Sequence, residues 1–252
     1  MLALYDLIIF RPILNLLVWF YNIIPGNDIG LAIIAMTCVI FIILYPFKIS
    51  QIKQQRALQA IQPKIDEIRK RLKDDKEGQA KELMELYKKD KVNPAASCLP
   101  LLVQLPVMIG LFQVLRSVLA AKSLNLLYTV VANPGIVNNM FLGIADLSKP
   151  NYVLAILAGG AQFWQSKQMM AKKGVVTPVP VEVAGSKPAE DESMSTMINS
   201  QMMYMMPVVT VFIGFSLPGG LALYWLVMSL LTVAQQGYLM SKPVPPVQTP
   251  QL

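Results

Sequence analysis

The chain has 252 residues, of which 54% are hydrophobic and 15% are charged, with a formal net charge of +7. A soluble domain carries about 25% charged residues, and most charges here lie in one stretch, so long apolar runs remain between them. The composition therefore excludes an ordinary soluble globular protein and predicts an all-α integral membrane protein.

Residues 1–27 are predicted to form an N-terminal helix that lies in the outer membrane interface. Arg11, Asn15, Trp19 and Asn22 recur three or four residues apart, which places them on one face of a helix. No basic segment precedes the apolar stretch and no small-residue cleavage site follows it, so we expect no secretory signal peptide.

Five apolar segments are predicted to cross the membrane, and Asp28 is expected to cap the first of them. Their ranges are 28–48, 96–121, 152–170, 201–216 and 217–240. The fourth is short for about 30 Å of hydrocarbon. The remaining segments are an outer loop, a Pro-, Gly- and Ser-containing inner loop and a Pro-rich tail expected to be disordered, at 122–151, 171–200 and 241–252.

Residues 49–95 are predicted to form a helical hairpin that projects into water. Ile61, Ile65, Ile68 and Leu72 step by four, three and four residues, a spacing typical of a coiled-coil seam. Acidic residues often stand four positions before basic ones in this segment, which supports exposed helices. The charges could serve only as a solvated face that sets topology, or the hairpin could contact ribosomes, targeting factors or arriving proteins.

Charge asymmetry predicts the orientation. The hairpin segment holds twelve lysines and arginines, whereas the segments expected on the other side offer only Arg11, Arg116, Lys122 and Lys149. By the positive-inside rule the hairpin and the C-terminus are cytoplasmic, and the N-terminus is outside.

The sequence gives little support for a metal site, a redox site or a transporter. There is no histidine, and Cys38 and Cys98 form no CxxC pair, so neither a metal site nor a redox site is indicated. No Asp or Glu lies within a predicted span, and no internal repeat suggests a secondary transporter. A structural assembly scaffold needs no particular chemistry and remains an open alternative.

Several sequence runs occur in an order that resembles the YidC/Oxa-type membrane protein insertases, in the bacterial short form that lacks the large periplasmic domain. A single run would be weak evidence, but six in one order are specific. The runs are Tyr45-Pro46, QPK at 62–64, MELYK at 84–88, NPAASCLPLLVQLP at 93–106, DLS at 146–148, and Met206-Pro207 with FSLPGGLALYW at 215–225, closed by Gln235-Gln236.

This resemblance implies a five-transmembrane-helix core around a polar groove that opens to the cytoplasm and sideways to lipid. It implies a multi-pass protein of the bacterial inner membrane that inserts and helps fold other membrane proteins, without covalent chemistry, metal or cofactor. Nascent membrane proteins and lipids are the expected partners, with the Sec translocon, ribosomes and targeting factors as further candidates, and no nucleic-acid function is expected.

Polar residues in the inner half of the predicted spans are the candidate groove and client-binding residues, because intramembrane polar groups usually face a bundle interior or a wet cavity. They are Thr37, Gln104, Gln162, Gln165, Tyr204, Trp225 and Ser229, with Thr232, Gln235 and Gln236 nearby. Ordinary interhelical hydrogen bonding is the alternative. It is equally open for Thr37, Ser229 and Thr232, whereas for Gln104 and Gln162 we favour the groove.

One position departs from the family pattern. Members usually carry a groove arginine four residues before the tyrosine of the Tyr-Pro pair, which the resemblance implies attracts acidic client segments; here Phe41 stands there. Lys48, about two helical turns further on, is the candidate charge at the groove mouth, whereas Arg116 lies near the outer end of its span. Snorkelling to headgroups is the alternative for both. We therefore expect weaker dependence on client acidity.

Overall fold

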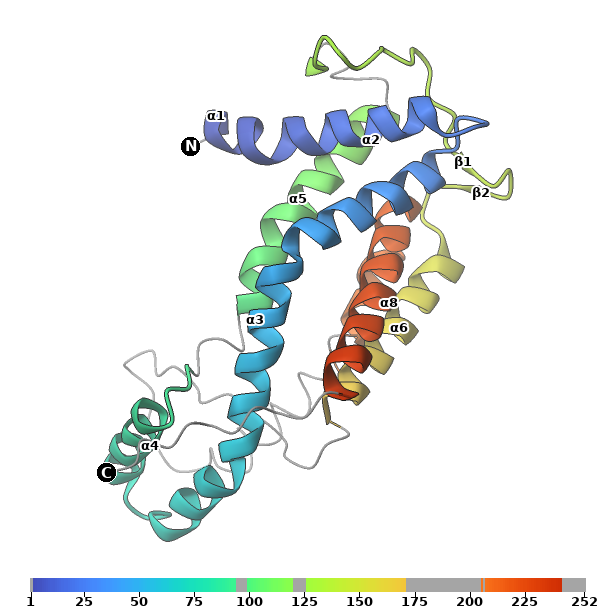
Figure 1. The fold of residues 1–252 in the computed structure, drawn as a ribbon. Helices are drawn as coiled ribbons and strands as arrows, with labels where there is room; N and C mark the ends of the chain where they lie inside the picture. The colour runs from blue at the N-terminus through green and yellow to red at the C-terminus, as the bar shows by residue number, and fades with distance from the viewer. Residues whose placement is uncertain (1, 94–98, 120–125, 171–204, 206, 242–252) are drawn as a thin grey trace.

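The computed structural model describes residues 2–93, 99–119, 126–170, 205 and 207–241. These residues form helices and one two-stranded β-hairpin (Figure 1). The predicted helical class therefore agrees with the structure. Of the described residues, Asp6–Ile23 and Ile29–Leu58 are long and apolar enough to cross a membrane, and Val103–Val118 is a shorter apolar helix.

The N-terminal helix consists of α1 (Leu2–Tyr5), the π-helical segment η1 (Asp6–Phe10) and α2 (Arg11–Ile23). It runs crosswise over the end of the bundle where α3 begins (Figure 1). Leu14, Leu17 and Val18 are buried in the core. Their burial ties this helix to the bundle through apolar packing, which supplies most of the stability of such an amphipathic helix.

Two asparagines of α2, Asn15 and Asn22, form hydrogen bonds with the backbone of the loop that follows α5. Asn15 is buried, accepts a hydrogen bond from Tyr128 N at 2.6 Å, and donates to the Leu126 carbonyl at 3.5 Å. Asn22 donates to the Ala132 carbonyl at 2.7 Å. Asn15 and Asn22 thus connect α2 to the loop by hydrogen bonds with loop backbone groups.

Helix α3 (Ile29–Arg71) spans 43 residues without a break. Asp28 caps it, as predicted, by accepting a hydrogen bond from Leu31 N at 2.9 Å. The helix continues past residue 48, where the first span was expected to end, and includes both Pro46 and Pro63. The predicted first span and the first arm of the predicted hairpin thus belong to one continuous helix, whose C-terminal part extends beyond the bundle (Figure 1).

Helix α4 (Lys76–Lys89) folds back along the C-terminal part of α3 (Figure 1). Lys64 pairs with Asp90 at 2.9 Å and Arg71 pairs with Glu82, so the two helices run antiparallel. The stepped apolar residues form a small separate core between them. It consists of Leu58, Ile61, Ile65, Ile68, Leu83, Tyr87 and Val92.

Helices α5 (Leu99–Leu119), α6 (Tyr152–Met170) and α8 (Gly219–Ser241) complete the bundle with α3. Helices α6 and α8 start together, because Gly219 N donates to the Lys149 carbonyl at 2.8 Å, and they run side by side in the same direction (Figure 1). Residues 207–214 are also helical. They pack on α6 where Gly159 has no side chain to exclude Val211.

The loop between α5 and α6 contains the short antiparallel strands β1 (Met140–Phe141) and β2 (Ala145–Asp146). This β-hairpin was not predicted from the sequence, since two-residue strands carry no alternating pattern. Hydrogen bonds from Ser148 lower the pKa of the Asp146 carboxyl and close the loop before α6. Residues 126–151 of this loop therefore form a folded cap at the end of the bundle.

Candidate polar site between α3, α5, α6 and α8

Lys48 places a cation between α3 and α8. Its Nζ donates to Thr232 Oγ1 at 3.1 Å and lies 3.4 Å from the sulfur of Met228. Met228 and Thr232 are one turn apart on α8, so they share one face. Within the described part of the chain, Lys48 has no ion pair with a carboxylate. The ammonium is thus held by a hydroxyl and a thioether, and its charge is not neutralised there.

The same ammonium covers the position where the family arginine was expected. Lys48 Nζ lies 4.8 Å from the centre of the Phe41 ring, within the range of a cation–π interaction. Phe41 is itself buried and its ring lies near that of Tyr45. Phe41 and Lys48 are seven residues apart, about two turns, which brings both onto one face of α3.

A second polar contact joins α5 to α8. The Gln104 amide Nε2 donates to the Tyr224 hydroxyl at 2.5 Å, and Tyr224 is fully buried. The sequence pointed to Gln104 and to Trp225, which is partly buried, but missed Tyr224. The sequence did contain a signal for Tyr224, because it stands in the same apolar run as Trp225. A tyrosine hydroxyl buried in a helix bundle needs a hydrogen-bond partner.

Thr37 and Thr232 each donate a hydrogen bond to a carbonyl of their own helix. Thr37 is fully buried and donates to the Ile33 carbonyl at 2.6 Å, the local bonding that a threonine makes inside a helix. Thr232 donates to the Met228 carbonyl at 2.7 Å while it accepts from Lys48. Ser229 is buried beside them on α8.

Buried amides gather toward the far ends of α6 and α8. Among the described residues, side-chain amide atoms of Gln162, Gln168, Gln235 and Gln236 are buried without a hydrogen-bond partner. Gln168 lies beside Gly237, so these ends of the two helices are adjacent. A buried amide without a partner is costly, and bound water or a ligand usually satisfies it. This end of the bundle therefore suits a hydrated space.

Other predicted groove residues lie at the edge of this cluster or beyond the described residues. Gln165 is partly exposed on α6. Tyr204 lies outside the described residues. The structure therefore brings together Phe41, Lys48 and the polar face of α8, and separately pairs Gln104 with α8.

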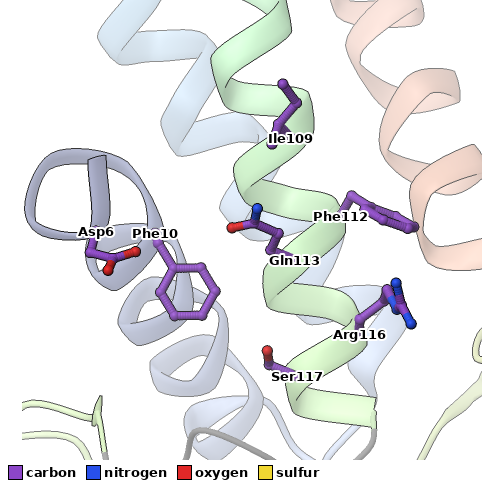
Figure 2. A pocket seen from close by; sticks show the side chains of 7 residues that line it. All are labelled: Asp6, Phe10, Ile109, Phe112, Gln113, Arg116 and Ser117. Carbon is purple, nitrogen blue, oxygen red and sulfur yellow. The ribbon is translucent and has the colours of Figure 1, made fainter. Parts of the chain in front are cut away.

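Arg116 lies away from the Lys48 cluster. It is twelve residues after Gln104, about 18 Å along the helix axis, and its guanidinium lies 5.5 Å from the centre of the Phe112 ring. These two side chains line an open hollow of about 590 Å³ between η1 and α5, together with Asp6, Phe10, Ile109, Gln113 and Ser117. Figure 2 shows Arg116 and Phe112 projecting from the side of α5 that faces away from Asp6 and Phe10.

Comparisons with known proteins agree on one family. The family model described as "60Kd inner membrane protein" matches residues 19–245. A protein of Fusobacterium nucleatum named "Membrane protein insertase YidC" is 34% identical over 219 residues, which are 86% of this chain and 88% of the relative. One of the same name from Geobacter sp. (strain M21) is 32% identical over 91% of this chain and 36% of the relative.

A solved structure supports the same relationship. The crystal structure described as "Active YidC insertase crystal structure with the first transmembrane domain resolved" has a TM-score of 0.61 and 25% sequence identity. The match covers 93% of this chain and 46% of that chain. The chain therefore spans most of the Fusobacterium relative and less than half of the Geobacter relative and of the solved protein.

Proposed function

This chain belongs to the 60Kd inner membrane protein family, and we propose that it inserts other membrane proteins into a bacterial membrane and helps them fold, without covalent chemistry. The observation that carries the proposal is the set of polar groups among apolar helices, namely Lys48 between α3 and α8 and the buried amides of α6 and α8. Such groups are retained inside a membrane protein mainly for function.

The physical task is to lower the barrier for a polar segment that has to cross hydrocarbon. Each unsatisfied backbone group costs several kcal/mol in the bilayer core. The unpartnered amides of α6 and α8 would hold water or donate and accept hydrogen bonds with an entering segment. A hydrated groove that reaches partway across the membrane therefore shortens the apolar path.

We place this groove on the cytoplasmic side. The proposed arrangement has five membrane-crossing helices, with the N-terminus outside and the α3–α4 pair and the C-terminus in the cytoplasm. The support is the concentration of lysines and arginines in the segment 49–95. In this orientation Gln235 and Gln236 lie near the inner end of α8, and Gln104 lies deeper.

Lys48 would supply the positive charge of the groove in place of the family arginine. Its ammonium lies against Phe41 and bonds Thr232, with no carboxylate partner among the described residues. An unneutralised cation at a groove mouth attracts acidic client segments. Because a flexible lysine makes a single point contact where arginine makes a fork, the preference for acidic clients should be weaker than with an arginine.

The α3–α4 pair is the candidate contact for ribosomes, targeting factors or arriving clients, and the Sec translocon is a further candidate partner. Its own small core holds it together independently of the bundle. A pure assembly scaffold is the competing function. It is less well supported, because a scaffold would need neither the buried amides nor a lysine without a carboxylate partner among the described residues.

Water access tests the groove. Single cysteines at positions 37, 41, 104 and 162, in a chain with Cys38 and Cys98 replaced by serine, would be labelled in membranes with a water-soluble maleimide. We expect reaction at 41, 104 and 162 and slower reaction at the fully buried 37. A cysteine at position 42 is the control and should not react, because Ile42 is exposed on the bundle surface that would face lipid. Protection of all four positions would contradict a hydrated groove.

A further inference from the structure

We propose that the tip of the β1–β2 hairpin, formed by Leu142, Gly143 and Ile144, docks into the lipid interface and anchors the loop between α5 and α6 to the membrane. This proposal rests on the membrane location of the chain but not on its insertase activity. Leu142 is 58% exposed and Ile144 is 84% exposed. Both aliphatic side chains therefore point out of the folded loop with nothing described to cover them.

The backbone conformation of the tip disfavours the leucine that stands at position 142. Leu142 and Gly143 have φ values of 51° and 69°, and Ile144 N donates to the Phe141 carbonyl at 2.9 Å. Positive φ at both central residues is the type I′ geometry, which favours Asn, Asp or Gly at the first of them. Leucine is strained there. A local rule broken at an exposed position points to a contact made by that side chain.

The hairpin is held firmly enough to present its tip. Asp28 uses one carboxylate oxygen to cap α3 and the other to accept a hydrogen bond from Leu142 N at 2.5 Å. The Phe141 ring occupies the space left by the missing side chain of Gly30. The tip is thus clamped to the first turn of α3 and does not depend on the tip side chains for its position.

The surroundings favour lipid as the occupant. Residues 126–145 contain no Asp, Glu, Lys or Arg, which is unusual for a loop that faces only water. The hairpin lies beside the start of α6 (Figure 1), whose first residues Tyr152 and Val153 are exposed and apolar. The exposed Lys149 stands between them in sequence. Aliphatic residues next to a tyrosine and a lysine form the usual interfacial anchor.

Fluorescence in proteoliposomes tests the proposal. An environment-sensitive fluorophore would be attached to Ile144→Cys, in the chain with Cys38→Ser and Cys98→Ser, in vesicles of phosphatidylethanolamine and phosphatidylglycerol. The same label on Met84→Cys is the control, because Met84 is also an exposed apolar residue, on α4. We expect a blue-shifted emission at 144 that lipids with spin labels near the headgroup quench, and neither effect at 84.

A second variant separates anchoring from folding. Leu142→Asn suits the type I′ turn, so its thermal midpoint in detergent should be unchanged or higher, while most of the quenching at 144 is lost. Water-like emission at 144, quenching that Leu142→Asn leaves intact, or a blue shift that needs an added protein would each overturn the proposal. Client insertion measured in the same vesicles reports separately on the proposed insertase function.

Discussion

The ammonium of Lys48 lies 4.8 Å from the centre of the Phe41 ring. A cation is therefore present where the family pattern would place an arginine, but it comes from a residue two turns further along α3. The hydroxyl of Thr232 on α8 holds it from the other side. Under the proposed function, Lys48 would supply the positive charge that the usual arginine gives other family members.

Replacement of Lys48 should weaken insertion of acidic clients selectively. Lys48→Ala removes the charge, so a client with an acidic tail should insert several-fold less, whereas a matched client with a neutral tail should change little, because steering by charge acts only on the charged segment. The measurement is insertion into proteoliposomes for two clients that differ only in their tails.

The matched control is Lys48→Arg, which keeps the charge and should preserve most of the acidic-client insertion. Equal loss for both clients in Lys48→Ala would mean that Lys48 serves packing instead of client attraction. In Phe41→Arg, a second cation beside Lys48 should strengthen the preference for acidic tails.

Gln104 and Tyr224 should contribute to stability as a coupled pair. Tyr224→Phe removes the acceptor of the Gln104 amide, and loss of one such hydrogen bond costs about 1 kcal/mol. Gln104→Ala should cost a similar amount, and the double variant less than the sum of the two. Thermal midpoints in detergent would show this; strictly additive shifts would rule out the coupling.

Asp28 should stabilise both the start of α3 and the tip of the β1–β2 hairpin. Asp28→Ala removes the cap of α3, worth about 1 kcal/mol, and also the bond to Leu142 N. Asp28→Asn retains a capping oxygen and should lower the thermal midpoint less. Hydrogen exchange at Leu31 and Leu142 should rise in the alanine variant; unchanged exchange at Leu142 would contradict the clamp.

The α3–α4 pair should open when its own core is damaged. Ile65 is nearly fully buried between the helices, so Ile65→Ala should cost about 2–5 kcal/mol of local stability. Trypsin should then cleave the segment faster while the bundle stays intact. Deletion of 58–88 should leave membrane integration unchanged and impair client insertion; full insertion after the deletion would limit this pair to a role in topology.

Local signals in the sequence predicted local structure well. Asp28 was expected to cap α3 because a capping residue acts within one turn, and the spacing of Ile61, Ile65 and Ile68 identified a face that is buried against α4. The same local reading could not show that α3 continues through Pro46 and Pro63, since neighbouring helices can compensate the lost backbone hydrogen bonds.

Contacts between residues far apart in the chain could not be predicted from the sequence patterns. The pattern of α2 suggested an interfacial face, but Asn15 bonds a loop more than a hundred residues away. Tyr224 gained its role only through Gln104, 120 positions earlier. Lys48 was a candidate for the groove charge from its position alone, but its contacts with Met228 and Thr232 of α8, 180 and 184 residues away, could not be predicted from that position.

Reconstitution of the full chain alone into liposomes, followed by addition of a small single-span client, tests the proposed function most directly. The expected result is that the client acquires a protease-protected span in these vesicles but not in empty liposomes, and that Lys48→Ala lowers the yield for an acidic-tailed client. Equal protection with and without the protein would contradict the insertase proposal and favour an assembly scaffold.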